Sequence, residues 1–529
     1  MISNADLATS ILRALAGLGV HEFVVAAGAR NAPLLPPLLD SSGVKVWNFF
    51  DEGSAAFFAL GRLMVDRAPV AVLTTSGTAV AELLPAVIEA FYQGLPLVLV
   101  TADRPRRFRG SGAPQAVDQV RIFGGYAEGT LDIDADTVTA TAWPRQLPAR
   151  PLHVNVCFEE ALETPAAGFD FAQFPAPQQQ PINEPADNAA ASAVLDSWLE
   201  DRSGLVVLAG GMSPARAESV ARFLAAVNAP VIADATSNLH GHAELNALLV
   251  PGGDAVLPAM GVRRVLRIGA VPAGRWWRDL ENHPAIAVLN VCAPPFPGLA
   301  RKENVETTGF SLLDYNCKHC LGARLARATP QLQPDLDDLM ALFPESEPAW
   351  IRRLSGIIPA GARVFLGNSL PIREWNLFAS RANPGTTFYA NRGANGIDGI
   401  VSTFLGVSAG CEESWLVVGD LSALYDLGAP WVIRQLPKGR RRIVVINNGG
   451  GKIFARVDSL RALPHAAREV LENRHAVSFE PWARLWSMNY IRLQSPATSA
   501  PLPDGDLVIE IVPDEATTES FWQRRQSTR

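Results

Sequence analysis

The chain has 529 residues, of which 48% are hydrophobic and 19% are charged, and its formal net charge is −7. This length exceeds one hydrophobic core and predicts about three domains, and the acidic balance argues against a nucleic-acid partner or an anionic membrane surface. No apolar run reaches the roughly 20 residues that a membrane span requires, and five cysteines in so long a chain predict a cytoplasmic location.

The segment Met1–Leu18 has helical apolar spacing and predicts a first helix rather than a signal peptide. After it, short runs rich in Val, Leu and Ile predict strands that are buried on both faces of parallel sheets. These runs are Glu22–Ala26, Val46–Phe50, Val70–Leu73, Leu95–Val100, Gly204–Leu208, Val265–Ile268, Ile286–Val291, Trp415–Val418 and Ile443–Ile446. Ser54–Val65 and Thr78–Gln93 predict intervening helices. The alternation predicts a doubly wound α/β fold.

Two segments interrupt this alternation and predict connections between domains. Residues 166–188 are rich in Pro, Gln and small residues, and residues 328–348 place a short helical run between prolines and acids. The prediction is three α/β domains, residues 1–168, 190–330 and 348–529. The first and third domains are candidates for distant copies of one fold.

Cys317 and Cys320 flank His319 in a Cys-x-x-Cys pattern. A zinc site needs a second ligand pair, and none stands at a suitable spacing. We interpret these cysteines as ordinary packing residues.

The most informative polar clusters follow two predicted strands of the third domain. The first is Gly419-Asp420-Leu421-Ser422, before a helical run that extends to Gln435, and the second is Asn447-Asn448-Gly449-Gly450. The 27 or 28 residues from Asp420 to Asn447 and Asn448 fit one βαβ crossover, which brings both clusters to the carboxyl ends of neighbouring strands. Carboxylate, amide and carbonyl oxygens suit Mg²⁺ bound together with a diphosphate, and glycines let the backbone approach phosphate closely. A Gly-Asp pair alone is typical of an ordinary turn; the combination is more specific.

In the first domain, Glu52 follows the predicted strand Val46–Phe50 and precedes the helix Ser54–Val65. A partly buried Glu can share a proton with a ligand. The alternative interpretation is an acid that the helix dipole favours at a helix start.

These features resemble the thiamine-diphosphate (ThDP) enzymes, and specific strings resemble the 2-succinyl-5-enolpyruvyl-6-hydroxy-3-cyclohexene-1-carboxylate (SEPHCHC) synthase family among them. The strings are Gly28–Leu34, Thr75–Val80, Thr101–Pro105, Gly367–Leu370, Asn391–Gly399 and Gly419–Leu427. They cover the first and third domains in order, whereas the middle domain matches mainly in fold pattern. The resemblance implies an aminopyrimidine-binding first domain, a middle nucleotide-fold-like domain without FAD, and a diphosphate- and Mg²⁺-binding third domain.

The resemblance also implies an activity and an assembly. The family decarboxylates 2-oxoglutarate with ThDP and Mg²⁺, or Mn²⁺, and adds the succinyl carbanion equivalent to isochorismate in menaquinone or phylloquinone biosynthesis. It implies a homodimer or homotetramer with active sites at the subunit interface.

Site roles transfer residue by residue from the matching strings. Glu52 would be the catalytic carboxyl, which contacts N1′ of the aminopyrimidine and promotes its imino form. The metal ligands would be Asp420, Asn448 and the carbonyl of Gly450. Other cofactor contacts would come from Ser76, Gly77, Ile397, Gly419, Leu421, Ser422 and Ile453. Substrate contacts would come from Arg30, Arg104, Gln115, Arg275, Ser369, Arg373, Arg392 and Phe454.

Arginines suit this role because both substrates are acids and a guanidinium binds a carboxylate in bidentate fashion. We interpret the remaining arginines near these strings as solvated surface groups. They are Arg106, Arg107, Arg109 and Arg440–Arg442.

Three positions depart from the family pattern. Ala29 replaces the usual Ser, Gly53 replaces the usual Arg, and Lys452 replaces a common Gln and adds a charge near the cofactor. These departures leave open a ThDP carboligase or decarboxylase with another 2-oxo acid or acceptor. A catalytically silent ThDP-fold protein is the alternative from another class.

Overall fold

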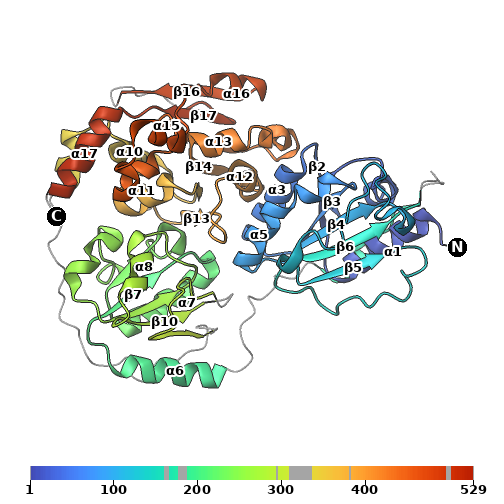
Figure 1. Ribbon diagram of the computed structural model, residues 1–529, viewed down its shortest axis with the longest axis horizontal. Coiled ribbons are helices and arrows are strands. Elements are labelled where there is room, and N and C mark those ends of the chain that lie inside the picture. Colours follow the sequence, from blue (N-terminus) through green and yellow to red (C-terminus); the bar gives the residue numbers. More distant parts are fainter. Residues whose placement is uncertain are drawn as a thin grey trace. The chain divides into compact units, whose positions relative to one another are not determined.

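The structure is a computed structural model that describes residues 2–159, 166–176, 188–292, 296–308, 336–380, 383–495 and 502–527. The chain divides into two compact units, both drawn in Figure 1. Unit 1 comprises residues 1–182, 393–409 and 425–437, and unit 2 comprises residues 183–392, 410–424 and 438–529. The Cys-x-x-Cys pattern at Cys317 and Cys320 lies outside the described residues.

Unit 1 is built on a six-stranded parallel sheet with the order β2-β1-β3-β4-β6-β5. Its strands are β1 (Glu22–Ala26), β2 (Lys45–Phe49), β3 (Val70–Thr74), β4 (Leu97–Asp103), β5 (Gly129–Ile133) and β6 (Leu152–Cys157). Its helices are α1 (Asn4–Gly17), α2 (Leu35–Leu39), α3 (Glu52–Asp66), α4 (Thr78–Ala81), α5 (Leu84–Gln93) and α12 (Ile400–Ser408). Figure 1 shows α1 and α3 on opposite sides of this sheet, and its central strands β3 and β4 are buried along their whole length.

Unit 2 contains two further parallel sheets, with the orders β11-β10-β9-β7-β8 and β13-β12-β14-β15-β17-β16. The strands of the five-stranded sheet are β7 (Leu205–Ala209), β8 (Val231–Ala233), β9 (Arg264–Ile268), β10 (Ala287–Val291) and β11 (Val305–Thr308). Those of the six-stranded sheet are β12 (Arg363–Leu366), β13 (Thr387–Tyr389), β14 (Glu413–Gly419), β15 (Arg440–Ile446), β16 (Asn489–Leu493) and β17 (Leu507–Ile511).

The α-helices of unit 2 connect and cover these strands. They are α6 (Asn188–Glu200), α7 (Pro214–Val227), α8 (Arg275–Asp279), α9 (Leu336–Leu342), α10 (Glu347–Ile357), α11 (Leu370–Phe378), α13 (Asp420–Tyr425), α14 (Asp458–Arg461), α15 (His465–Glu472), α16 (Glu480–Leu485) and α17 (Glu515–Ser527). None of the helices in the described part of the chain is both long and apolar enough to cross a membrane.

The fold prediction is confirmed, because all three sheets are parallel and alternate with helices. The two six-stranded sheets also share one topology. When strands are numbered by their order within each sheet, both follow 2-1-3-4-6-5. This supports the hypothesis that the first and third thirds of the chain are copies of one fold.

Two predicted helices are interrupted, and both interruptions involve proline. The segment 78–93 forms α4 and α5 instead of one helix, with Pro85 in the first turn of α5. The helical run that follows Asp420 ends at Tyr425, and a 3₁₀ helix, Ala429–Gln435, has Pro430 in its first turn. Proline fits a first helical turn because its missing N–H has no partner there, but it breaks a helix interior.

Part of the predicted linker 166–188 packs against unit 1. Phe171 is fully buried and its ring meets that of Phe23 edge-on, while its backbone N–H donates to the carbonyl of Ser42 at 3.0 Å. The linker interpretation is therefore wrong for these residues. The division into three domains stays a proposal, since the contacts group the second and third sheets into one unit.

The interpretation of Arg441 and Arg442 as solvated surface groups is wrong. Their side chains are only 4% and 3% exposed. Arg441 pairs with Asp506 at 2.6 Å, and Arg442 donates to the carbonyls of Pro503 and Gly505 at 2.7 and 2.9 Å. Arginine this deeply buried needs such partners, so these two side chains anchor β15 to the segment before β17.

Candidate functional site

The predicted site residues of unit 2 follow the carboxyl ends of adjacent strands. Gly367–Ser369 follow β12, Asp420 follows β14, and Asn447–Gly450 follow β15. The order of the sheet reverses between β12 and β14, because β13 lies on one side of this pair and β15 on the other. Open α/β sheets bind ligands in the crevice at such a switch point.

The structure brings Asp420 to the glycine loop after β15, as the spacing predicts. The Oδ2 atom of Asp420 accepts hydrogen bonds from the N–H groups of Gly449 and Gly450, each at 2.9 Å, and Oδ1 accepts one from Leu421 at 2.6 Å. Asp420 is 2% exposed. Burial raises the pKa of its carboxyl, and the bond from the N–H of Gly450 opposes that shift.

The two neighbouring asparagines have different environments. Asn447 donates to the carbonyl of Val477 at 2.8 Å and to Oε1 of Glu510 at 2.7 Å. Asn448 donates from Nδ2 to Oε2 of Glu347 at 2.9 Å, and its Oδ1 is buried without a hydrogen-bond partner among the described residues. Because a buried oxygen of this kind is costly without a partner, Asn448 rather than Asn447 suits a role as metal ligand.

Glu347 belongs to a pair of buried carboxyls that the sequence analysis missed. Glu347 and Glu374 are 2% and 1% exposed. Burial raises the pKa of Glu347 to about 7, and burial followed by the charge of Glu347 raises the pKa of Glu374. Both look like ordinary helix acids in the sequence, because the partner of each is distant along the chain.

His475 is a second residue that sequence reasoning did not find. Its Nε2 lies 3.3 Å from Oδ2 of Asp420, and its backbone N–H donates to the carbonyl of Gly449 at 3.2 Å. It follows α15 and belongs to none of the strings that carry the family resemblance, so no sequence signal pointed to it.

The charge of Lys452 is neutralised within unit 2. Its Nζ lies 2.7 Å from Oε1 of Glu515 and 3.4 Å from Oε2 of Glu472, and its side chain is 8% exposed. Glycine is required at position 450, where φ is +135° and a Cβ would meet the carbonyl oxygen of Glu472 at 2.5 Å. Ile453 and Phe454 follow in a 3₁₀ helix, Lys452–Arg456.

Three predicted substrate residues gather beside β12. Ser369 has a φ of +71°, an uncommon value for a residue other than glycine, and its carbonyl accepts a hydrogen bond from Nη1 of Arg373 at 2.6 Å. Nη1 of Arg392 donates to Oδ1 of Asn368 at 3.0 Å. Arg275 begins α8, beside the other sheet, where its side chain is 57% exposed and lies 3.7 Å from Asp279.

In unit 1, Glu52 is the first residue of α3, and Asp51 caps the helix by accepting the N–H of Ser54 at 2.6 Å. Burial is the largest cause that raises the pKa of the Glu52 carboxyl, and the charges of Asp51 and Glu82 raise it further. The carboxyl is half-buried and therefore keeps a proton to higher pH than an exposed glutamate.

The other predicted residues of unit 1 lie in loops at the same edge of its sheet. The N–H of Arg30 donates to Oγ1 of Thr75 at 3.3 Å, and Oγ of Ser76 is buried without a partner among the described residues. Gly77, with a φ of +89°, packs directly on Gln115, because a Cβ there would lie 3.0 Å from that of Gln115. The guanidinium of Arg104 lies 5.9 Å from the ring centroid of Phe108.

The segment that carries Ile397 and α12 is held in unit 1 by two buried carboxylates. Glu89 accepts backbone N–H groups of this loop. Asp426 accepts the N–H and Oγ–H of Ser402 at 2.7 and 2.8 Å and the Oγ–H of Ser54 at 3.4 Å. Burial raises the pKa of Asp426 to about 6. Neither acid was predicted from the sequence to have a role.

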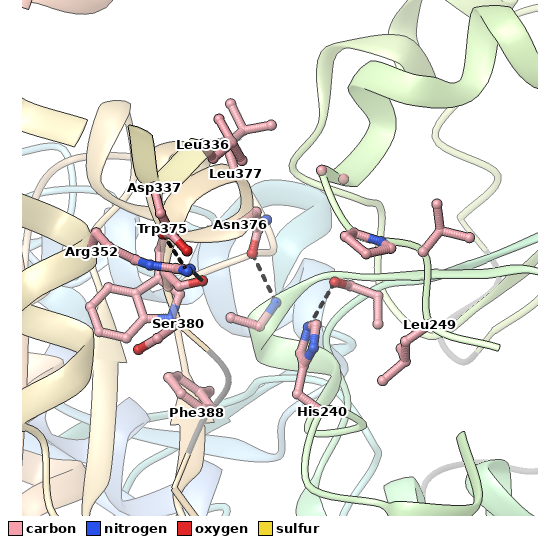
Figure 2. A pocket seen from close by; sticks show the side chains of 17 residues that line it. His240, Leu249, Leu336, Asp337, Arg352, Trp375, Asn376, Leu377, Ser380 and Phe388 are labelled. Atoms are coloured by element: carbon pink, nitrogen blue, oxygen red, sulfur yellow. Dashed lines mark hydrogen bonds and ion pairs between the residues drawn. The ribbon is translucent and has the colours of Figure 1, made fainter. Parts of the chain in front are cut away.

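A separate pocket of about 550 Å³ lies in unit 2 beside α11, and Figure 2 shows the side chains that line it. Its polar groups are engaged: Arg352 pairs with Asp337 at 2.8 Å, and Asn376 accepts the N–H of Ala235 at 2.8 Å. None of the predicted site residues is among the described residues that line it. This pocket is therefore distinct from the candidate site.

Within the described residues there is no group of three or more His, Cys, Asp or Glu side chains that could hold a metal ion. The candidate metal site is of another kind, with one carboxylate, one amide oxygen and one backbone carbonyl. This donor set suits Mg²⁺ that also binds a diphosphate. Oδ1 of Asn448 has no hydrogen-bond partner among the described residues, and Gly450 has no side chain to cover its backbone; both features fit a bound Mg²⁺–diphosphate.

Comparison with known proteins identifies similar chains over almost the whole length. A family model described as "Thiamine pyrophosphate enzyme, N-terminal TPP binding domain" matches residues 5–122. A protein of Akkermansia muciniphila is 40% identical over 98% of this chain and 98% of its own length, and one of Bdellovibrio bacteriovorus is 38% identical over 99% and 98%. A protein of a Synechococcus species is 36% identical over 85% of this chain and 83% of its own length. All three are named 2-succinyl-5-enolpyruvyl-6-hydroxy-3-cyclohexene-1-carboxylate synthase.

Proposed function

Because the chain belongs to the 2-succinyl-5-enolpyruvyl-6-hydroxy-3-cyclohexene-1-carboxylate synthase family, a family of ThDP-dependent enzymes, we propose that it decarboxylates 2-oxoglutarate and adds the succinyl unit to isochorismate. One observation carries the proposal beyond the family name. Asp420 follows β14 at the switch point of a parallel sheet, and Asn448, whose Oδ1 is buried without a hydrogen-bond partner among the described residues, follows the neighbouring strand β15. A diphosphate with its Mg²⁺ would bind there.

In this proposal Asp420, Asn448 and the carbonyl of Gly450 hold Mg²⁺, with Mn²⁺ as a substitute. Gly419, Leu421 and Ser422 contact the diphosphate, and Ser76, Gly77, Ile397 and Ile453 contact the rest of the cofactor. When bound, ThDP supplies the electron sink that decarboxylation of a 2-oxo acid requires.

Glu52 is the proposed catalytic residue. Its carboxyl would exchange a proton with N1′ of the aminopyrimidine, and its half-buried position supports this role. A carboxyl whose pKa is raised by burial is better matched to proton exchange near neutral pH than an exposed glutamate.

The proposed substrate contacts are the groups that bind acids or close the site. Arg30, Arg104, Arg373 and Arg392 would bind the carboxylates of 2-oxoglutarate and isochorismate, for which the guanidinium geometry is suited. Gln115, Ser369 and Arg275 would add polar contacts, and Phe454 would exclude water. Arg275 has the weakest support, since its side chain is exposed beside the other sheet of unit 2.

We also propose a cytoplasmic homodimer or homotetramer with active sites at the subunit interface, in menaquinone or phylloquinone biosynthesis. The family resemblance supports this assembly and pathway. The cytoplasmic location is supported by the small number of cysteines, of which the three in the described residues are free.

Ala29 and Gly53 support a second candidate, a ThDP carboligase that uses another 2-oxo acid or acceptor. The experiment is an omission series that follows isochorismate by absorbance and CO₂ release from 2-oxoglutarate or pyruvate. We expect consumption of isochorismate only when ThDP, Mg²⁺ and 2-oxoglutarate are all present. Release of CO₂ without loss of isochorismate would favour the second candidate. Absence of ThDP binding would favour a catalytically silent protein, which the retained Glu52, Asp420 and Asn448 argue against.

A further inference from the structure

A buried carboxylate of α5 holds a loop that lies more than 300 residues away in the sequence. Oε1 of Glu89 accepts the backbone N–H of Gly393 at 2.6 Å, and Oε2 accepts those of Ala394 and Asn395 at 2.7 and 3.3 Å. Nε2 of Gln93, one turn along α5, also donates to Oε1. All of these residues belong to unit 1.

The contact between Glu89 of α5 and the loop at Gly393 is closely packed. Glu89 is 3% exposed, so its carboxyl depends on protein donors such as these more than on water. A Cβ at position 393 would meet the carbonyl oxygen of Glu89 at 2.6 Å and its Oε1 at 3.0 Å. Asn395 has a φ of +64°, a conformation that few residues other than glycine adopt. The loop therefore approaches α5 only with glycine at 393 and with Asn395 in a left-handed conformation.

The chemistry of the contact favours one loop conformation. Successive backbone N–H groups that converge on an anion form a concave binding site, and hydrogen bonds to an ionised group are shorter and stronger than neutral ones. Removal of the carboxylate would take the shared acceptor from three part-buried hydrogen bonds, which costs more than the loss of one fully exposed bond. The loop would then move to reach water or another acceptor.

The anchored residues are flanked by two proposed site residues. Arg392 immediately precedes Gly393, and Ile397 follows Asn395 by two positions. We propose that Glu89 is a positioning residue that fixes residues 393–399 of this loop, and with them the proposed cofactor contact Ile397. The proposed substrate contact Arg392 adjoins the anchored Gly393 in the chain. This inference rests on the proposed function. A displacement of about 1 Å in such a contact can lower the rate about 10²-fold.

The first test is hydrogen exchange of the full-length protein without substrates. In E89Q and in E89A, the peptide that spans residues 391–399 should exchange at least about tenfold faster than in wild type, because its amides lose their acceptor. G393A disturbs the same contact from the loop side, because its Cβ would clash with the carbonyl oxygen of Glu89. It should give the same result. E128Q is the matched control, since Glu128 is exposed and lies in unit 1. Unchanged exchange in all three variants would overturn the anchoring.

The second test separates positioning from a purely structural role. Variants whose melting temperature stays close to that of wild type are compared for kcat/KM, KM and ThDP affinity. We expect kcat/KM for the acid substrates to fall at least about tenfold, with a rise in KM, while E128Q matches wild type. Faster loop exchange with unchanged kinetics would overturn the positioning role. If wild type itself does not consume the substrates, the proposed function fails, while the exchange measurement still decides the anchoring.

Discussion

Nδ2 of Asn448 donates a hydrogen bond to Oε2 of Glu347 at 2.9 Å, and Oδ1 of the same amide is left buried without a hydrogen-bond partner among the described residues. Burial raises the pKa of Glu347 to about 7, so its ionised form predominates only above that pH. In that form Glu347 accepts but cannot donate, and it fixes which end of the Asn448 amide faces it. In the proposed function, the free oxygen is then available to Mg²⁺.

We predict that E347Q binds Mg²⁺ more weakly by about 10- to 100-fold, the usual effect of removing a group that orients a metal ligand. A glutamine can donate to Oδ1 and so favour the wrong amide orientation. Titration calorimetry of ThDP binding at increasing Mg²⁺ measures the effect. E345Q is the control, since Glu345 precedes the same helix and, within the described part of the chain, the side-chain hydrogen bond of Asn448 goes to Glu347. Equal Mg²⁺ dependence in E347Q and E345Q would contradict the orienting role.

We predict that K452Q lowers stability and leaves the choice of acceptor unchanged. Lys452 pairs with Glu515 and shares the buried Glu472 with Arg474. Its removal leaves Arg474 in place but takes away the closer cationic partner of Glu515, so the free energy of unfolding should fall by roughly 1–3 kcal/mol. Urea unfolding measures this loss, with the exposed Lys302 changed to Gln as control. A variant as stable as wild type that accepts a different second substrate would show that Lys452 acts on specificity.

We predict a pH-dependent stability difference between wild type and D426N. Burial raises the pKa of Asp426 from 3.8 to about 6, so the folded state binds its proton more tightly than the unfolded state. The stabilisation by that proton is present below about pH 4 and is lost as pH rises to about 6. Wild type should lose about 3 kcal/mol relative to D426N across this window.

Urea unfolding at pH 4, 5, 6 and 7 checks this prediction. D136N, at an exposed position of unit 1, should show a constant difference from wild type. A constant difference for D426N as well would mean that Asp426 titrates at an ordinary pKa in the folded protein.

Much of the fold could be predicted, because continuous apolar runs specify strands buried on both faces. The spacing of Asp420 and Asn448 likewise specified one crossover, and the structure places both at one sheet edge. The segment 78–93 was predicted as one helix, but Pro85 gave a sequence signal for the break between α4 and α5.

Other parts of the candidate site could not be predicted, because they depend on contacts between distant segments. Glu89 and Glu347 look like ordinary helix acids, and only tertiary structure shows that they accept bonds from Gly393 and Asn448. The one available signal at Glu89 is its position beside the apolar Ala86, Val87 and Ala90. Arg442 was misinterpreted for the same reason, since its partners are carbonyls more than 60 residues away.

The measurement that tests the central claim most directly compares wild type and E52Q for isochorismate consumption and for ThDP binding in the same preparations. Glutamine keeps the shape of the side chain but cannot exchange the proton with N1′. We predict that E52Q binds ThDP within about tenfold of wild type and consumes isochorismate at least about 10²-fold more slowly, the usual contribution of a proton-transfer group. An E52Q enzyme with undiminished activity, or a wild type that does not bind ThDP, would contradict the account.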